Sequence, residues 1–186
     1  MPIAALADIH GNVHALRAVL ADDRLAAADR IVVLGDVVAG TFPVETLELG
    51  TVRCCHATPD DEEAILTRST PARELAASLA GIEERVVIGG HTHVQFDRTA
   101  GRHRYVNVGS VGRPCESRPG AYWTLLGPDV ELLRTEYDVD EAAAAVLASG
   151  QPSAERVAAQ LVDPPSPDDW TAQWEALRSS RTPRLP

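Results

Sequence analysis

The stretch Ala7-Asp8-Ile9-His10-Gly11-Asn12 decides how this chain begins to fold, and it follows the apolar run Ile3 to Ala7. The run predicts a buried strand that ends at polar residues. Because strand side chains alternate with a period of two, Asp8 and His10 can point the same way. A carboxylate and an imidazole at a strand end suit a metal ion. The same residues are also typical of a polar strand end that only caps the next helix, so both interpretations stay open.

The next elements predict a strand-helix-strand unit. Asn12 is a good N-cap for an amphipathic helix over residues 13 to 21. A β-branched run over residues 31 to 34 then ends at Gly35-Asp36. Such a unit makes parallel pairs, so Asp8 and Asp36 are expected at the same carboxyl edge of the sheet, where α/β proteins bind ligands. The turn lacks the glycine pattern of a dinucleotide or P-loop site.

Two later strands also end in histidine. Residues 51 to 55 predict a strand that stops at His56, and residues 85 to 88 predict one that runs into Gly89-Gly90-His91-Thr92-His93. The paired glycines allow the backbone to approach a neighbour or a ligand closely. Two histidines in so short a turn seldom serve packing, so this segment is the stronger of the two metal signals.

The remaining elements are predicted from periodicity and caps. Between the two halves we expect at most a short helix over 44 to 49, and a helix over 71 to 80 with Thr70 as its N-cap. The second half predicts an antiparallel β meander with strands at 94–99, 102–108, 121–126 and 130–137.

The C-terminal part, about 140 to 178, is predicted to be helical. We expect helices over 141–148, capped by Asp140, over 153–162 and over 168–178. The last places Trp170, Trp174 and Leu177 on one face, as a docking stripe. We expect residues 1–186 to form a single domain.

Composition narrows the class of protein. The chain has 186 residues, 45% of them hydrophobic and 24% charged, which is typical of a globular domain. No bilayer-length apolar run and no signal peptide are evident, and three cysteines without a Cys-x-x-Cys favour a reducing cytoplasm. A net charge of −10 disfavours a nucleic-acid surface, although it also serves solubility. The sequence also allows a homo-oligomer.

Six residues follow strand ends and together predict a metal centre. Four of the six histidines of the chain are among them. The set is Asp8, His10, Asp36, His56, His91 and His93. Oxygen and nitrogen ligands without a thiolate suit Mn, Fe, Zn, Co or Ni. Six ligands with one shareable carboxylate indicate two divalent ions, about 3.5–4 Å apart.

These motifs resemble those of the calcineurin-like metallophosphoesterases, in the branch of small bacterial and archaeal phosphodiesterases. The matching segments are Asp8-x-His10, Gly35-Asp36, His56, Gly90-His91-x-His93 and the turn 107–112. The resemblance covers residue 3 to about 137 and implies an α+β fold, a four-layer α/β/β/α sandwich. It also implies that Asp8, His10, Asp36 and His93 hold one metal and that Asp36, His56 and His91 hold the other, with Asp36 bridging.

The chain departs from the family pattern in one segment. Between the Gly-Asp motif and the later histidine, the family carries a Gly-Asn-His-Asp/Glu motif whose Asn binds the second metal. Only 20 positions separate Asp36 from His56, and that interval holds neither Asn nor His. We therefore expect that this chain lacks a strand and helices of the family between residues 40 and 51. The second metal site is then expected to be weak or empty. Asn12 could substitute as a ligand or could only cap its helix.

The resemblance implies a metal-dependent phosphoesterase, either a phosphodiesterase or a phosphatase. A hydroxide bridging the metals would attack the phosphorus of a small phosphate ester, with Asp36 holding both metals and His91 stabilising charge. Arg113 is a candidate phosphate contact or a surface arginine, and Asn12 is a second substrate-binding candidate. The rival interpretation is a catalytically impaired family member that acts as a metal-binding or scaffold protein.

Overall fold

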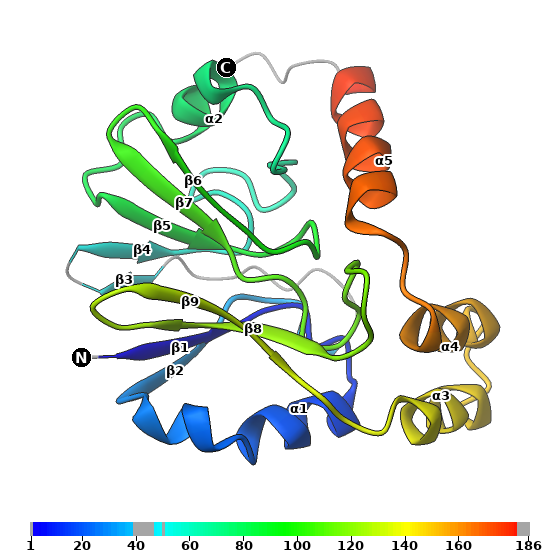
Figure 1. The fold of residues 1–186 in the computed structure, drawn as a ribbon. Coiled ribbons are helices and arrows are strands. Elements are labelled where there is room, and N and C mark those ends of the chain that lie inside the picture. The colour runs from blue at the N-terminus through cyan, green and yellow to red at the C-terminus, as the bar shows by residue number, and fades with distance from the viewer. Residues whose placement is uncertain (1, 39–46, 50, 182–186) are drawn as a thin grey trace.

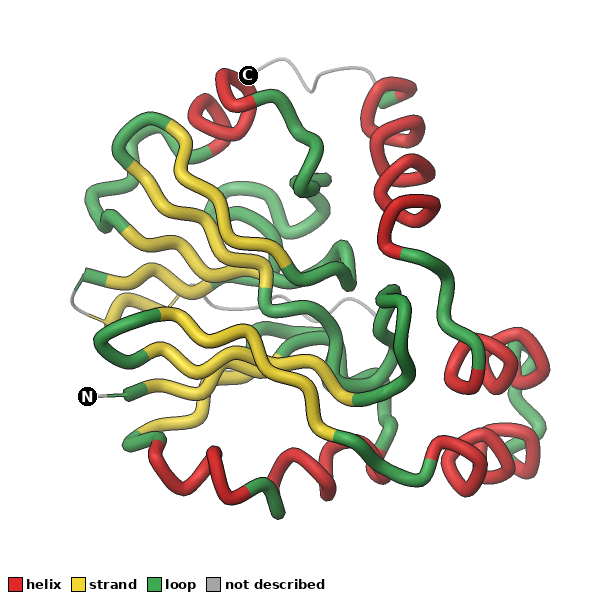
Figure 2. The backbone as a smooth tube through the Cα atoms, viewed as in Figure 1, coloured by secondary structure: helices red, strands yellow, loops and turns green. Residues whose placement is uncertain are grey.

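Two β-sheets face each other at the centre of the protein (Figures 1 and 2). The computed structural model describes residues 2–38, 47–49 and 51–181. The first sheet has the strand order β2-β1-β8-β9. Its strands are β1 (Ile3–Leu6), β2 (Arg30–Val33), β8 (Ala121–Leu126) and β9 (Val130–Thr135).

The second sheet has the order β3-β4-β5-β7-β6. Its strands are β3 (Leu47–Leu49), β4 (Val52–Cys54), β5 (Val86–Gly89), β6 (Phe96–Ala100) and β7 (His103–Asn107). β4, β5 and β7 run parallel, and the edge strands β3 and β6 are antiparallel to their neighbours.

Three hydrophobic cores separate four layers. Alternation along β1 sends Ile3 and Ala5 to the core between the sheets and Ala4 and Leu6 to the core beneath the first sheet. Helix α1 (Val13–Leu20) closes that lower core with Val19. On the far side, helix α2 (Ala72–Ser78) buries its leucine against the second sheet. The layers are α/β/β/α, so the predicted four-layer α+β sandwich is confirmed.

The parallel β1–β2 pair and the Asn12 cap of α1 are also confirmed. The antiparallel meander is wrong, because the two hairpins belong to different sheets. β7 pairs with β5 in one sheet, and β8 pairs with β1 in the other. A chain segment can cross between sheets at the glycine-rich turn 107–112, and the strand pattern alone does not show which sheet it enters.

The prediction of a short helix over 44 to 49 is wrong for residues 47–49, because Leu47–Leu49 is a strand. Residues 44–46 lie outside the described residues. β3 pairs with β4, so the sheet edge where a strand was expected to be missing is covered. Two caps shift by one or two residues. α2 follows Pro71 rather than Thr70, whose hydroxyl binds Glu175, and α3 (Val139–Ala148) is capped by Asp138 rather than Asp140.

Three helices lie beside the carboxyl ends of the parallel strands (Figure 1). They are α3, α4 (Ala154–Val162) and α5 (Pro167–Ser180). In α5, Trp170 and Trp174 are half-buried as expected of a docking face, but Leu177 is exposed. No helix in the described part of the chain is long and apolar enough to cross a membrane.

Candidate metal centre

The loops after β1 and β2 lie side by side because the backbone pairing of the two strands continues past their ends. The amide of Asp8 donates to the carbonyl of Gly35 at 3.2 Å, and the amide of His10 donates to the carbonyl of Asp36 at 2.7 Å. This extension brings the first three predicted ligands to one edge of the sheet.

The backbone is strained at most of the predicted ligands. Among the described residues, positive φ angles outside glycine occur at Asp8, His10, Asp36, His91 and His93, with values from 45° to 68°. A left-handed conformation is uncommon outside glycine, even though Asp and His adopt it more readily than most residues, and it persists where surrounding contacts enforce it. All five positions are candidate ligands, and strain of this kind is concentrated at functional sites.

Asp8 is fully buried and held from both sides. Its Oδ2 accepts the amide of His91 at 2.9 Å, and its carbonyl accepts the Ser110 hydroxyl at 2.9 Å. A Cβ on Gly90 would lie 2.7 Å from Asp8 Oδ2, so only glycine permits this approach. Desolvation raises the pKa of Asp8 well above its usual value, against the lowering effect of the His91 amide. Its Oδ1 has no hydrogen-bond partner among the described residues.

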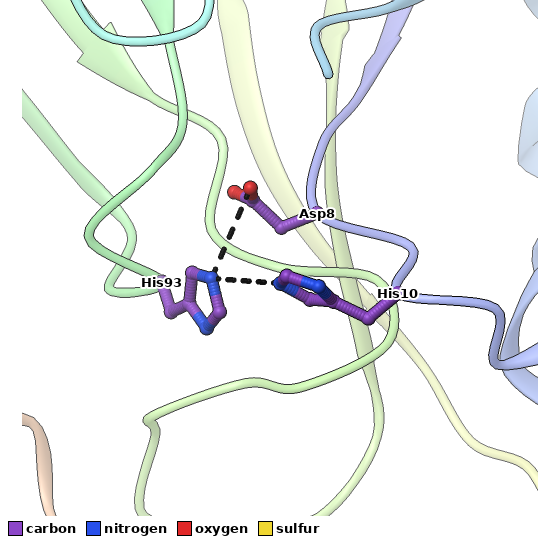
Figure 3. Close-up of side chains that lie close together, drawn as sticks. All are labelled: Asp8, His10 and His93. Carbon is purple, nitrogen blue, oxygen red and sulfur yellow. Dashed lines mark hydrogen bonds and ion pairs between the residues drawn. The ribbon is translucent and has the colours of Figure 1, made fainter. Parts of the chain in front are cut away.

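The first ligand group joins Asp8, His10 and His93 (Figure 3). The Nε2 atoms of His10 and His93 are 3.2 Å apart, and His93 Nε2 is 3.8 Å from Asp8 Oδ1. His93 Nδ1 lies 2.7 Å from the carbonyl of Arg113, and because a carbonyl can only accept, Nδ1 carries the proton. The Nε2 lone pair of His93 is therefore left for a ligand.

The second ligand group is centred on His56 and His91, whose Nε2 and Nδ1 atoms are 3.1 Å apart. His56 Nδ1 donates to the carbonyl of Leu34 at 3.0 Å. That bond occupies Nδ1, so Nε2 is the atom of His56 that can bind a metal. His56 Nδ1 also lies 3.8 Å from Asp8 Oδ1, a distance longer than a hydrogen bond.

Asp36 lies between the two groups. Its Oδ2 is 3.9 Å from His10 Nε2, and its carboxylate falls within 4.8 Å of ligand atoms of both Asp8 and His56. This is the position that a carboxylate shared by two metals would take. All six predicted ligands are thus brought together at the carboxyl edge of the two sheets.

Burial keeps the imidazoles of His10, His91 and His93 neutral. Desolvation lowers the pKa of His10 and of His91 to about 4, and it lowers the pKa of His93 well below its usual value. The positive charge of the nearby Arg113 guanidinium acts in the same direction on the pKa of His10. Neutral imidazole is the form that binds metals, so near pH 7 these nitrogens are ready to bind.

The donor set fits divalent metal ions. Two nitrogens bound at about 2.1 Å to one tetrahedral metal lie about 3.4 Å apart, close to both observed nitrogen pairs. A cation would also supply the partner that the buried Asp8 Oδ1 lacks. The mixture of imidazole and carboxylate favours a transition metal over calcium.

Neither asparagine of the chain is free to replace the missing amide ligand. Asn12 Oδ1 accepts the amide of Ala15 at 3.0 Å, as its capping role requires. Asn107 Oδ1 accepts the amide of Gly109 at 2.9 Å. With Asp36 counted in both groups, the first offers four candidate ligands among the described residues and the second offers three, Asp36, His56 and His91.

Arg113 stands beside the first group, half-buried. Its Nη2 donates to Gln160 Oε1 at 3.1 Å, while its buried Nε has no hydrogen-bond partner among the described residues. Its carbonyl also orients His93. Sequence reasoning named its side chain but missed the carbonyl, which no residue-type pattern could reveal.

Helix α5 brings a further side chain that sequence reasoning read only as a docking surface. The Trp174 ring lies 5.1 Å from the His91 ring between centroids, and Trp170 Nε1 donates to the carbonyl of Thr92 at 3.2 Å. Glu175 accepts the hydroxyls of Thr67 and Thr70 and ties the same helix to the loop before α2. The sequence signal for this contact was the spacing of four residues between Trp170 and Trp174, which places both rings on one face of the helix.

Comparison with solved structures identifies the fold. The chain is similar to a metallophosphoesterase from Sphaerobacter thermophilus, with a TM-score of 0.73, 20% identity, and coverage of 87% of this chain and 98% of that one. It is also similar to a hypothetical protein from Pyrococcus horikoshii, with a TM-score of 0.72, 16% identity, and coverage of 89% and 99%. YfcE, a phosphoesterase from E. coli, matches with a TM-score of 0.50, 19% identity, and coverage of 72% and 92%. No protein-family model and no curated protein sequence match the chain.

Proposed function

We propose that this chain, which has the fold of the calcineurin-like metallophosphoesterases, is a metal-dependent phosphoesterase that hydrolyses a small phosphate ester. The observation that carries the proposal is the pair of close nitrogen contacts, His10 with His93 and His56 with His91, flanking the Asp36 carboxylate. Two divalent transition metals would occupy these groups, the second more weakly because, with Asp36 counted in both groups, it has three candidate ligands against four.

Divalent ions bound there would polarise a phosphate oxygen and lower the pKa of a water molecule. The chain supplies the rest. The carbonyls of Leu34 and Arg113 fix the rings of His56 and His93, so the ligands need little reorganisation when substrate binds. The Arg113 guanidinium, beside His10, would neutralise phosphate charge in a protein whose net charge is −10.

His91 has a second role in this proposal. With Nδ1 facing the second group, its Nε2 carries the ring proton, and that atom is buried without a partner among the described residues. A buried donor beside the reacting phosphate can stabilise the negative charge that develops in the transition state.

The test is hydrolysis of bis(p-nitrophenyl) phosphate by Mn²⁺-loaded protein. Asp36→Asn should lower kcat/KM by at least about 100-fold, because it removes the charge shared by both groups. Asp29→Asn is the matched control, since Asp29 is exposed at the opposite end of the same strand. Equal rates for wild type and Asp36→Asn would refute the proposal. Metal binding without turnover in wild type would favour a non-catalytic metal-binding protein instead.

A further inference from the structure

A cavity of about 350 Å³ opens beside the first ligand group. One wall belongs to the metal-binding edge and includes His10, Asn12 and Arg113. The opposite wall is the hairpin of α3 and α4, which contributes mainly apolar side chains. They include Ala142, Ala145, Val146, Val157 and Leu161. The cavity is therefore polar where it meets the metal ligands and apolar away from them.

The charge of the lining points to an anionic head group. None of the described residues that line the cavity is Asp or Glu, although acidic residues outnumber basic ones by 27 to 17 in the whole chain. Arg113 is the fixed cation of the lining, and its buried Nε lacks a partner. An anion near His10 would satisfy that donor, and the organic group attached to it would then extend along the apolar wall.

The helical wall is tied to the metal-binding edge. Asn12 Nδ2 donates to the Tyr137 hydroxyl at 3.2 Å, just before α3, and Arg113 Nη2 donates to Gln160 of α4 at 3.1 Å. His14 Nδ1 lies 3.6 Å from Glu141 Oε2 of α3. These contacts hold the wall at a fixed place, as a pre-formed binding site requires. Both helices lie beyond residue 137, outside the segment that carries the family motifs.

We propose that this cavity binds the organic group of the substrate, a compact, uncharged and predominantly apolar group the size of an aryl ring. The substrate class is then a phosphate ester of such a group, with its phosphate between His10 and Arg113. This inference rests on the proposed phosphoesterase function. A cavity of this size is at the small end of ligand sites, which disfavours a large group, and its apolar wall disfavours a highly charged one.

The test compares phenylphosphonate with methylphosphonate, measured by titration calorimetry on the Mn²⁺-loaded protein. The two ligands share the anionic head, so contacts at the metal ligands and Arg113 contribute equally to both. Burying the phenyl ring on the apolar wall should make phenylphosphonate bind at least about tenfold more tightly.

Ala145→Trp fills the cavity and should abolish that preference while methylphosphonate binds as before. Ala144→Trp is the matched control, because both alanines are exposed on the same helix but only Ala145 lines the cavity. It should keep the preference. Equal affinities in wild type, binding of neither phosphonate, or a preference that survives Ala145→Trp would each overturn the inference.

The calorimetry and the hydrolysis assay fail independently. A phenyl preference without hydrolysis of any ester would show that the cavity binds an aryl group, but would refute the phosphoesterase and with it the substrate class. Hydrolysis of bis(p-nitrophenyl) phosphate without a phenyl preference would keep the phosphoesterase and refute the cavity assignment.

Discussion

The Nε2 atoms of His10 and His93, 83 positions apart in the chain, face each other at 3.2 Å. The two rings are tilted by 52°, so they do not stack, and His93 is fixed by the carbonyl of Arg113. Burial keeps both imidazoles uncharged near neutral pH. Two neutral nitrogens aimed at one point are the arrangement that a shared metal ion requires.

His93→Ala should remove the first metal. We expect the Mn²⁺ content of the saturated protein, measured by elemental analysis after gel filtration, to fall by about one ion per chain, because this nitrogen has the best-oriented lone pair of its group. His14→Ala serves as the control, since His14 faces Glu141 instead of the ligands. A content unchanged from wild type would show that His93 binds no metal.

Trp174 should report on the second metal. Its ring is 5.1 Å from the His91 ring, so Co²⁺ bound at His56 and His91 should quench its fluorescence through a short-range mechanism. We expect Trp174→Phe to remove most of the Co²⁺-dependent quenching. Trp170→Phe should keep more of the Co²⁺-dependent quenching, because Trp174 makes the ring contact with His91 whereas the Trp170 indole donates to the carbonyl of Thr92. Quenching that persists in His91→Ala would contradict this assignment.

Gly112→Ala should destabilise the protein and loosen the first ligand group. A Cβ at this position would lie 1.8 Å from the carbonyl oxygen of Ile9, so the segment 8–12 would have to move. We expect a loss of about 2–4 kcal/mol in urea unfolding and weaker Mn²⁺ binding. Gly127→Ala, where the nearest atom is 4.0 Å away, is the control and should change neither. Equal effects of the two substitutions would show that the close approach is unimportant.

Asp22 should make stability depend on pH. Its carboxylate accepts two side-chain hydrogen bonds from Arg24 and one from Thr135, and it caps the short 3₁₀ turn Asp23–Ala27. The Arg24 hydrogen bond is the largest cause that lowers the pKa of Asp22 in the folded protein. The lowered pKa means that the carboxylate stabilises the fold above the unfolded-state value of about 3.9 and loses that effect as the pH falls further.

Asp22→Asn should therefore cost about 1–2 kcal/mol in urea unfolding at pH 7. The difference from wild type should shrink when both proteins are unfolded at pH 3. A difference of the same size at both pH values would show that the charge of Asp22 contributes nothing. Asp23→Asn, an exposed neighbour, is the control at both pH values.

The resemblance to the family was sufficient to predict the four layers, and the strand pattern predicted where the candidate ligands meet. The β1–β2 pair follows from continuous apolar strands, and parallel strands necessarily place Asp8 and Asp36 at one edge. The Gly-His-x-His turn adds two nitrogens to the same edge, and the structure brings all six predicted ligands together there.

The sequence was not sufficient where the outcome depends on contacts between distant segments. The period of two is the same for β7 and β8, so nothing local shows that they enter different sheets. The carbonyl of Leu34 orients His56 whatever side chain residue 34 carries. Asn12 could be read as a cap or as a ligand, and only the hydrogen bond from Ala15 shows that its oxygen is engaged at the helix.

The departure from the family motif has a structural counterpart. The family pattern calls for an asparagine at the second metal, and in this chain both asparagines are engaged elsewhere. β3 pairs with β4, so the sheet edge is covered even though the interval between Asp36 and His56 is short. The short interval therefore leaves the β3–β4 pairing intact, and under the proposed function its effect would fall on the second metal site.

The central claim is that two nitrogen pairs flanking Asp36 hold two metal ions. Anomalous X-ray diffraction at the manganese edge, from crystals equilibrated with Mn²⁺, tests it most directly. We predict two peaks about 3.5–4 Å apart, one beside His10 and His93 and a weaker one beside His56 and His91. A single peak or none at these residues, at saturating Mn²⁺, would contradict the two-metal centre.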